Sequence, residues 1–498
     1  MGIDGASVIA RLSASVAWER ISRSSRDIAP AGCLVDDRSS IRAGTLRAGT
    51  VLAFVPVYEV PSVWRWPDVP LFRFSRRSAR GLHRAQSRAA AIGARGGMTI
   101  GCPECGALAH TSALAGRMLA RCRVCHYPLE RASGRSVAAA LACSLTTFVL
   151  LLPGNLSPLM TVHLLGGERS AVLASGIVLM WRERFELLAV LLGLAGIVLP
   201  LVRFSALSVV LAAVLLRWRP RWLGACYRWT IWLDAWAMPD VFLLGCFVGY
   251  TRVTQDLTGS IDAGGYCFVA AAFMSMVTRA TLDRRTVWRA IAPEHEVAPG
   301  ERVLSCTACD LVAPVQHEGR ACPRCGWKLR KRKPDAIARA AALTLAAFVL
   351  AFPANLYPMT TSLQLGHPVT HRIIDGVTEL FKAGLWPLGI LIIGTSIAIP
   401  FAKLFGMAWF IVSTLRRSTR HLRTKTFVYR LIDELGRWSN VDVFTIAAFA
   451  PLIQFGGLAS SRPDDGATAF ALVVFLTMAA SRAFDPRLMW DAAQGRRS

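Results

Sequence analysis

One pattern occurs twice in this chain and constrains any fold that it can adopt: two C-x-x-C pairs, then an apolar stretch that ends in Pro-x-Asn-Leu-x-Pro. The first copy begins near residue 100 and the second near residue 300. The shared register extends beyond the cysteines, with Arg203 opposite Lys403 and Asp240 opposite Asp442. Because a repeat is normally one structural unit used twice, most of the chain is predicted to consist of two homologous halves.

Each half is predicted to be embedded in a membrane. Hydrophobic residues make up 53% of the chain and the mean hydropathy is +0.41, although the formal net charge is +25. In a soluble protein this charge would suggest nucleic-acid binding, whereas in an apolar chain it indicates basic loops on one side of a bilayer. A helix needs about 20 residues to cross the hydrocarbon core. We predict eight spans, four in each half: Ser136–Leu156, Phe185–Leu216, Ile231–Tyr250 and Gly264–Val277, then Ala336–Leu356, Leu385–Leu415, Trp438–Gly457 and Ala467–Ala480.

Basic residues are unevenly distributed over the loops that join these spans. They concentrate between the second and third span of each half, and the opposite loops contain few of them. By the positive-inside rule, the basic loops, both cysteine clusters and both termini are predicted to be cytoplasmic. The residues concerned are Arg217, Arg219, Arg221 and Arg228, then Arg416, Arg417, Arg420, Arg423, Lys425 and Arg430.

The second apolar stretch of each half is longer than one bilayer crossing. Pro200 lies near the middle of the first such stretch and Pro400 near the middle of the second. Proline has no backbone N–H to donate and disturbs the helical ladder. We therefore expect a single kinked span that reaches into the cytoplasm, since two crossings would invert the second half relative to the first.

The cysteine quartets are the strongest chemical pattern in the sequence. Two C-x-x-C pairs at this spacing present four thiolates in the tetrahedral arrangement that suits zinc. Iron stays open as an alternative, because the same four-sulfur geometry accepts it. A haem attachment at Cys122–His126 is not expected, since the second copy has Gly326 in place of the histidine. The predicted structural metal ligands are Cys102, Cys105, Cys122 and Cys125, and Cys306, Cys309, Cys322 and Cys325.

Ionisable residues inside the spans are candidates for a transport cavity, because a charge at the bilayer centre costs about 2.5 to 3.5 kcal/mol on insertion scales. If the second and third helices of the second half are neighbours, Lys403 and Asp442 are expected to face a polar cavity. The first half has Arg203 and Asp240 at the matching positions. The alternatives are that both aspartates cap helix ends, or that Lys403 extends to the headgroups. The predicted cavity residues are Ser396, Lys403, Ser439, Asp442, Thr477 and Asp240.

The two Pro-x-Asn-Leu-x-Pro elements are predicted to form turns at the outer end of the first span of each half. Proline leaves a helix carbonyl without its donor, and asparagine can donate to such a group in a bend. Contact with a ligand stays open as an alternative. The residues are Pro153, Asn155 and Pro158, and Pro353, Asn355 and Pro358.

The repeat divides the chain into five segments. Residues 1–98 match neither copy, contain many arginines and no lysine, and are predicted to be a basic, disordered extension without a nucleic-acid-binding motif. The expected fold is an all-α polytopic membrane protein with two tandem repeats, each a small β-containing zinc ribbon and a four-helix transmembrane domain. The ribbons are expected at 99–132 and 300–332, and the transmembrane domains at 133–290 and 333–492.

These residues resemble the paraquat-inducible protein A family of bacterial inner-membrane proteins. The resemblance covers roughly Gly101 to Asp491 and rests on the doubled ribbon, the proline–asparagine turn, the span with Lys403 and the stretch Trp438–Phe444. It implies a subunit that moves phospholipid between inner and outer membranes, alongside a periplasmic tunnel protein of the mammalian-cell-entry type. It also implies a polar cluster in the second half, at Ser396, Lys403, Ser439, Asp442 and Thr477.

The sequence favours transport over catalysis. It contains no G-x-x-x-x-G-K-[ST] phosphate loop, and no segment gathers a nucleophile, a base and an orienting acid. A protonatable Asp442 beside Lys403 would permit a proton-coupled cycle. Two alternative functions stay open: a secondary transporter of small amphiphiles, and a sensor or scaffold whose ribbons recruit a protein, for which Lys403 and Asp442 would be dispensable.

Overall fold

The computed structural model describes residues 53–56, 98–111, 118–131, 136–164, 167–256, 258–293, 301–364, 367–452, 454 and 459–495. The predicted basic extension at 1–98 therefore lies almost entirely outside the described residues. Within it, strand β1 (Ala53–Pro56) pairs with β4 (Met118–Arg121) in antiparallel fashion. This short segment takes part in a sheet, in contrast to the disorder expected for the extension as a whole.

Each half begins with a small ribbon built from short antiparallel strands. In the first ribbon, β2 (Met98–Gly101) pairs with β3 (Leu108–Thr111), and β4 pairs with β5 (Pro128–Arg131). In the second, β9 (Val303–Ser305) pairs with β10 (Val312–Pro314), which a short 3-10 helix η2 (Val315–His317) follows. The predicted β-containing ribbons are thus present in both copies.

The helices after each ribbon follow the same order in both halves. The first half contains α3 (Val137–Leu156), α4 (Leu173–Arg182), α5 (Glu186–Gly193), the π-helix η1 (Leu194–Val198), α6 (Leu199–Leu215), α7 (Leu223–Leu233), α8 (Pro239–Asp256), α9 (Ala263–Thr281) and α10 (Arg284–Ile291). The second half contains α11 (Ala336–Leu356), α12 (Ile373–Lys382), α13 (Trp386–Ile392), the π-helix η3 (Ile393–Ala398), α14 (Ile399–Leu415), α15 (Leu422–Leu435), the 3-10 helix η4 (Gly436–Asn440), α16 (Val441–Phe449), α17 (Asp465–Ala483) and α18 (Arg487–Ala493).

Five helices are long and apolar enough to cross a membrane by length and composition. They are α3, α11, α17 and the two 30-residue helices Glu186–Leu215 and Trp386–Leu415. Helix α9 reaches the same standard together with α10, to which it is bent by 66°, and the apolar segment of α8 is shorter. The chain is therefore a mostly helical, multi-pass membrane protein of two tandem repeats, as predicted. The count of four spans in each half stays a prediction, since α16 has only 9 residues.

The two long helices accommodate their central prolines through a π-helical turn. Pro200 and Pro400 each follow such a turn, η1 in the first half and η3 in the second. In these turns Leu199 N–H donates to the Leu194 carbonyl and Ile399 N–H to the Gly394 carbonyl. The wider turn shifts the hydrogen-bond register just before a residue that cannot donate. Each apolar stretch thus continues as one helix.

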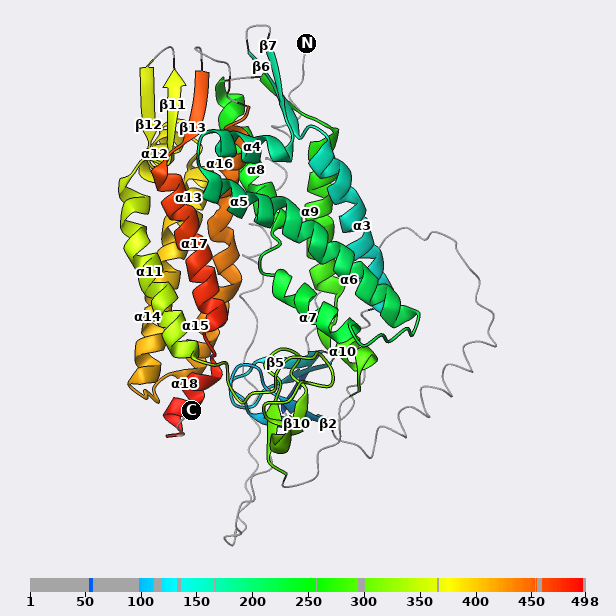
Figure 1. Ribbon diagram of the computed structural model, residues 1–498. Coiled ribbons are helices and arrows are strands. Elements are labelled where there is room, and N and C mark those ends of the chain that lie inside the picture. The colour runs from blue at the N-terminus through cyan, green and yellow to red at the C-terminus, as the bar shows by residue number, and fades with distance from the viewer. Residues whose placement is uncertain are drawn as a thin grey trace, which may run out of the picture. The chain divides into compact units, whose positions relative to one another are not determined.

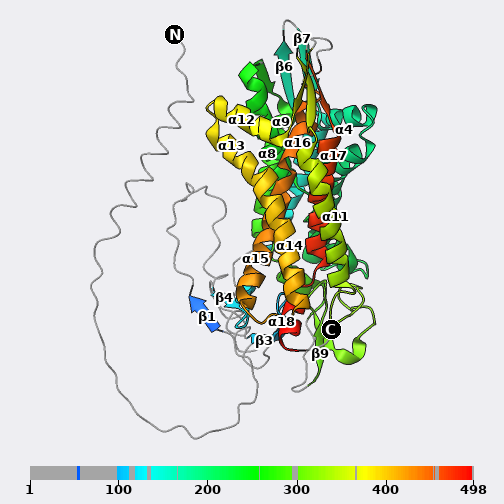
Figure 2. The ribbon, with the colours of Figure 1, turned by 90° about the vertical axis from the view of Figure 1, so that its left-hand side faces the viewer.

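Within each half, the first and last long helices pack along each other, α3 on α9 and α11 on α17 (Figures 1 and 2). The two halves meet where α8 crosses α16. A Cβ atom at Gly245 would lie 3.0 Å from the Val441 carbonyl oxygen, and one at Gly249 would overlap the Phe449 ring. Thr445 Oγ1 donates to the Gly245 carbonyl at 3.1 Å. The two glycines, four residues apart, permit the close helix approach typical of small-residue motifs in membranes.

At the end of the helices opposite the ribbons, each half carries a three-stranded antiparallel sheet (Figure 1). The strand orders are β7-β6-β8 and β12-β11-β13, which are equivalent in the two repeats. These sheets were not predicted from the sequence. Their bounds are β6 (Met160–Leu164), β7 (Gly167–Ala171), β8 (Thr258–Ile261), β11 (Thr360–Gln364), β12 (His367–His371) and β13 (Ala459–Pro463).

The ribbons pack crosswise on the helices. The first ribbon shares a buried apolar cluster with α14, α15, α17 and α18 of the second half, and the second ribbon shares one with α6, α7 and α10 of the first half. Equivalent arginines make both contacts. The Arg228 guanidinium lies 5.0 Å from the centre of the Trp327 ring, and that of Arg430 lies 4.9 Å from the centre of the Tyr127 ring. The crossed ribbons therefore tie the two halves together.

Candidate functional site: two cysteine quartets and a charged cavity

The eight predicted metal ligands form two buried groups of four. Within each group all sulfur atoms lie within 4.8 Å of one another. Four sulfurs placed tetrahedrally at about 2.3 Å from a zinc ion would lie about 3.8 Å apart. The measured Sγ–Sγ distances approach this value: 3.5 Å for Cys102–Cys125, 3.6 Å for Cys105–Cys122, 3.7 Å for Cys306–Cys325 and 3.6 Å for Cys309–Cys322. Both donor sets therefore fit a tetrahedral metal ion.

Each C-x-x-C pair closes through the same backbone turn. The residue after its second cysteine has a positive φ and donates its N–H to the carbonyl of the first cysteine. Glycine reaches this conformation without strain. It occupies only two of the four turns, since His126 and Asp310 stand at the other two. The turn residues, with their φ angles, are Gly106 at 73°, His126 at 60°, Asp310 at 56° and Gly326 at 69°.

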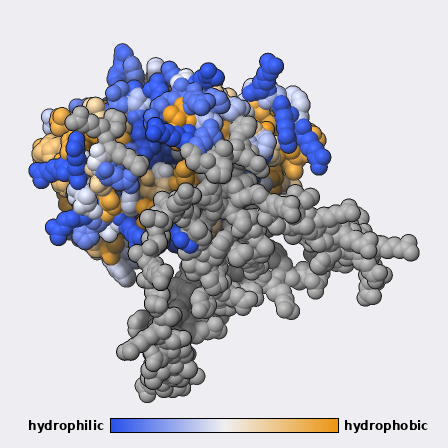
Figure 3. Space-filling model, turned by 90° about the horizontal axis from the view of Figure 1, so that it is seen from below, coloured by the Kyte–Doolittle hydropathy of each residue, from blue (hydrophilic) through white to orange (hydrophobic). Residues whose placement is uncertain are grey.

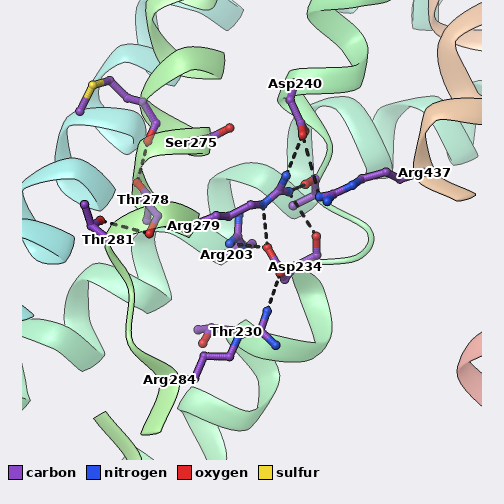
Figure 4. A network of polar contacts seen from close by, with 12 residues as sticks. Arg203, Thr230, Asp234, Asp240, Ser275, Thr278, Arg279, Thr281, Arg284 and Arg437 are labelled. Atoms are coloured by element: carbon purple, nitrogen blue, oxygen red, sulfur yellow. Dashed lines mark hydrogen bonds and ion pairs between the residues drawn. The ribbon is translucent and has the colours of Figure 1, made fainter. Parts of the chain in front are cut away.

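A second cluster, of charged side chains that are mostly buried although Arg284 is exposed, lies among the helices of the first half (Figure 4). Asp234 follows α7 and accepts from Arg203 Nη2 at 2.5 Å, from Arg279 Nε at 3.0 Å and from Arg284 Nη2 at 2.8 Å. Arg279 also donates to Asp240 on α8, at 2.7 Å. Two carboxylates thus hold three arginines from α6, α9 and α10 in one network.

The second half contributes to the same network. Arg437, in η4, lies 3.9 Å from Asp240 and is also paired with Glu434 (Figure 4). Asp240 therefore faces arginines from both repeats. Together with the α8–α16 crossing, this ion pair connects the halves close to their shared interface.

A cavity of about 460 Å³ lies beside this network and between the two halves. Seven basic and four acidic side chains line it. Glu104 and Tyr127 belong to the first ribbon, so this ribbon forms part of the cavity wall. Burial raises the pKa of the Glu104 carboxyl to about 7, and the positive charges of Arg430 and Arg487 oppose that increase. The charged lining residues are Arg203, Arg279, Arg284, Lys403, Arg430, Arg437, Arg482, Glu104, Asp234, Asp433 and Glu434.

Hydrophilic residues also predominate on the visible surface at the ribbon end of the molecule, with apolar residues towards the flanks (Figure 3). The apolar flanks are expected of helices that face lipid, and the polar end is expected of a segment that leaves the bilayer.

Of the predicted cavity residues, Lys403 lines this cavity. Its side chain is 1% exposed, and its ammonium group donates to the Gly436 carbonyl at 3.2 Å. A Cβ atom at Gly436 would lie 2.9 Å from Lys403 Cε, so the absence of a side chain there makes room for the lysine. The structure thus shows which backbone group Lys403 contacts, and its role in a transport cavity stays a prediction.

The other predicted cavity residues do not belong to the lining of this cavity. Ser396 is buried next to Thr395, and Ser439 donates to the Gly436 carbonyl that also accepts from Lys403. Thr477 is buried and donates to the carbonyl of its own helix at Val474. Asp442 is partly buried at the start of α16, and Asp240 belongs to the arginine network described above. A transport role for this set stays a prediction.

The proline–asparagine elements end α3 and α11. Asn155 Nδ2 donates to the Leu151 carbonyl at 2.6 Å, and Asn355 Nδ2 donates to the Ala351 carbonyl at 2.7 Å. Pro153 and Pro353 lie inside the last turn. The carbonyls of the closing prolines, Pro158 and Pro358, accept from Gly264 and Gly466 at the start of the last long helix of each half. The elements therefore connect two helices structurally.

Asp234, Arg279 and Arg437 are functional-site residues that were not predicted from the sequence. Asp234 and Arg437 fell at the edges of apolar stretches, where a charge is common and has no special meaning. The G-x-x-x-G spacing of Gly245 and Gly249 is a sequence pattern that indicates close helix packing.

A model of paraquat-inducible protein A matches residues 137–292 and 337–494, which together make up more than half of the chain and correspond to the two helical repeats. The chain belongs to the paraquat-inducible protein A family. This finding confirms the family predicted from the ribbon and turn motifs. The match of one model to two regions also confirms the duplication.

Curated relatives of this family cover most of the chain. It is 29% identical to the "Intermembrane transport protein PqiA" of Escherichia coli strain K12, over 78% of this chain and 95% of that protein. It is 26% identical to the "Lipophilic envelope-spanning tunnel protein A" of the same strain, over 78% of this chain and 91% of the relative. A "Probable intermembrane transport protein" of Haemophilus influenzae is 26% identical over 78% of this chain and 95% of its own length. No solved structure matches the chain significantly.

Proposed function

We propose that this chain is the inner-membrane subunit of a system that moves phospholipid between the inner and outer membranes. It passes lipid to or from a periplasmic tunnel protein of the mammalian-cell-entry type. The names of the relatives support intermembrane transport, and the five apolar helices support a multi-pass location. The role is that of a transport protein and not of an enzyme.

One structural observation carries this proposal: a charged cavity that lies between two helical repeats of a membrane protein. Buried charge among lipid-facing helices is costly and is usually retained for a substrate path or a proton relay. Lys403 links the cavity to the predicted polar set, because Ser439 contacts the same Gly436 carbonyl. In this proposal the lipid headgroup passes through the cavity and along Ser396, Ser439, Asp442, Thr477 and Asp240.

The ribbons have a structural role in this proposal. When bound, zinc would hold four thiolates of each quartet together and so fix the two knuckles relative to each other. A closed set of four cysteines leaves no open coordination position for substrate. Iron in the same four-sulfur geometry would therefore also have a structural role. With the basic loops on the cytoplasmic side, the ribbons and both termini are cytoplasmic and the three-stranded sheets face the periplasmic partner.

Substitution of Lys403 tests this function. The Lys403→Met variant removes the charge and keeps the apolar stem, and Lys382→Met, at an exposed position, is the matched control. We expect Lys403→Met to accumulate normally but to stop transfer of isotopically labelled phospholipid between the two membranes, whereas Lys382→Met should transfer at the normal rate.

Purification from native membranes is the complementary test. We expect mass spectrometry to identify co-purified phospholipid and a periplasmic partner with both variants. Normal transfer by Lys403→Met would instead favour the scaffold function, in which the membrane part only anchors the ribbons. Co-purified small amphiphiles without phospholipid would favour a secondary transporter.

A further inference from the structure

The cavity carries more positive charge than its own carboxylates can neutralise. In the network of Figure 4, Asp234 and Asp240 face Arg203, Arg279 and Arg284. Arg437 adds a fourth positive charge and is paired with Glu434, so four arginines face three carboxylates. A buried charge is costly unless it is paired and hydrogen-bonded. This local excess of positive charge favours an anion as an additional occupant of the cavity.

Arg203 identifies where the anion would bind. Arg203 is 2% exposed and lines the cavity, and its Nη2 atom pairs with Asp234. Its Nε and Nη1 atoms have no hydrogen-bond partner within the part of the chain that the structure describes. Buried guanidinium donors are normally satisfied, since an unsatisfied one loses its hydration without compensation. The planar guanidinium matches the oxygens of a phosphate group.

A row of aromatic rings leads from the surface of the first half to the same region. Trp229 and Trp232 lie on one face of α7 and are 53% and 48% exposed. Their ring centroids are 5.5 Å apart, Trp232 lies 5.9 Å from Trp236, and Trp236 stacks on Phe475 of the second half at 5.9 Å. We call these four residues the aromatic row.

The aromatic row ends at residues whose chain neighbours line the cavity. Ala235 lines the cavity directly before Trp236, and Met478 lines it three residues after Phe475 on α17. Arg279 Nη2 donates to the carbonyl of Ala237, directly after Trp236, at 3.1 Å. Exposed tryptophans are typical of the membrane interface, where an apolar ring and a polar N–H each find their own environment. An apolar path from the bilayer therefore meets a basic cavity at the junction of the repeats.

We propose that the cavity binds the phosphate group of a phospholipid through Arg203 and Arg279, and that an acyl chain lies along the aromatic row. This inference rests on the proposed function and identifies the point at which lipid enters. The lipid moves in sideways from the leaflet beside α7, between the first and the second repeat. Its phosphate supplies the acceptors that Arg203 Nε and Nη1 lack, and its tails stay in contact with apolar rings.

The test compares three probes on the full chain in detergent: short-chain phosphatidylglycerol, inorganic phosphate and the corresponding diacylglycerol. Binding is measured by quenching of tryptophan fluorescence or by microscale thermophoresis. We expect phosphatidylglycerol to bind, inorganic phosphate to compete weakly for the same site, and diacylglycerol not to compete. A diacylglycerol affinity equal to that of phosphatidylglycerol would overturn the anion site.

Substitutions divide the site into its two parts. Arg203→Gln should weaken phosphatidylglycerol binding by about tenfold to a hundredfold, the usual effect of losing charge-assisted hydrogen bonds, and Arg203→Lys, which keeps the charge, should weaken it less. Arg221→Gln, at an exposed position outside the cavity, is the control and should bind normally. An unchanged affinity in Arg203→Gln, or in Arg203→Lys if the glutamine variant does not fold, contradicts the proposal.

Trp236→Leu distinguishes a lipid from free phosphate. It should weaken phosphatidylglycerol binding and leave inorganic phosphate binding unchanged, and Trp218→Leu, outside the aromatic row, should affect neither. If inorganic phosphate binds as tightly as phosphatidylglycerol and Trp236→Leu has no effect, the site is one for free phosphate and the lipid proposal is wrong. If the unmodified chain transfers lipid but Arg203→Gln binds phosphatidylglycerol with normal affinity, this site is rejected and the proposed function is kept. If the chain binds phosphatidylglycerol at this site but transfers no lipid, the site is kept and the proposed function is rejected.

Discussion

The two halves share their architecture but stabilise their buried basic residue differently. In the first half Arg203 pairs with Asp234, which lies two residues before Trp236. The position two residues before the equivalent Trp438 is Gly436, and Lys403 contacts only its backbone carbonyl among the hydrogen bonds of the described chain. A carboxylate pairs with Arg203, whereas a backbone carbonyl accepts a hydrogen bond from Lys403. The two repeats thus hold one buried cation that is paired with a carboxylate and one that donates to a backbone carbonyl.

The ribbons show a second difference between equivalent positions. Glu130 of the first ribbon pairs with Arg289 at 2.5 Å, and Arg332 after the second ribbon pairs with Asp491 at 2.5 Å. The two pairs have the same separation along the chain but opposite polarity. Each pair links a ribbon to the helices of its own half, whereas the apolar clusters link it to the other half. Because the charges are reversed, each ribbon residue is attracted to the helix residue of its own half and repelled by the equivalent helix residue of the other half.

Removal of the cysteines should produce the largest effect. In Cys105→Ser/Cys125→Ser and in Cys309→Ser/Cys325→Ser, one quartet loses its metal, a contribution of about 10 kcal/mol or more in isolated zinc domains. We expect each variant to accumulate poorly and to contain half the zinc of the unmodified chain, as measured by elemental analysis. Cys143→Ser, outside the quartets, is the control. Full zinc content in either double variant would refute the assignment of the ligands.

Loss of the Asp234 carboxylate, which the second half lacks at the equivalent position, should have the second largest effect on stability. Asp234→Asn leaves buried Arg203 without its charged partner and weakens the contacts of Arg279 and Arg284. Breaking a buried ion pair costs about 3 to 5 kcal/mol, so the melting temperature in detergent should fall clearly. Glu186→Gln, which removes an exposed acid, should change it little. Equal melting temperatures for the two variants would show that the network does not stabilise the fold.

Reversal of the ribbon charges should have an intermediate effect. Glu130→Arg places two arginines together in the first half and should cost about 2 kcal/mol, less than a fully buried pair because Arg289 remains partly exposed. The double variant Glu130→Arg/Arg289→Glu copies the polarity of the second half and should recover most of the loss. Thermal unfolding of the single and double variants gives the coupling free energy between residues 130 and 289. Additive effects would show that the pair is not responsible for the loss.

The smallest effect on stability is expected at Lys403. Lys403→Met removes a buried cation, but the Gly436 carbonyl still accepts from Ser439 and Asp433 keeps its ion pair with Arg482. Replacement of a buried charge by an apolar side chain of similar length is often neutral or stabilising, so the free energy of unfolding should change by about 1 kcal/mol or less. A loss as large as that of Asp234→Asn would contradict the difference between the halves.

Much of the fold could be predicted from local pattern. The quartets, the helix positions and the tandem arrangement follow from spacing and hydropathy, and the family match confirms the identification. The site was predicted less completely, because Lys403 stands out as a charge in an apolar stretch whereas Asp234 and Arg437 do not. Their importance depends on which helices meet, and a one-dimensional pattern does not contain that information. The outer sheets were also not predicted, because their strands are short and come from distant segments.

The sequence by itself determined that the chain has two cysteine quartets able to hold a metal ion and two apolar helical units, because cysteine spacing and hydropathy act over short stretches. Only the tertiary structure decided that each ribbon docks on the opposite half and that the cavity lies between the repeats. Both features depend on the crossing of α8 and α16 and on side chains brought together from distant segments. The physical reason is that packing selects among helix faces of similar apolarity, which the sequence pattern alone does not distinguish.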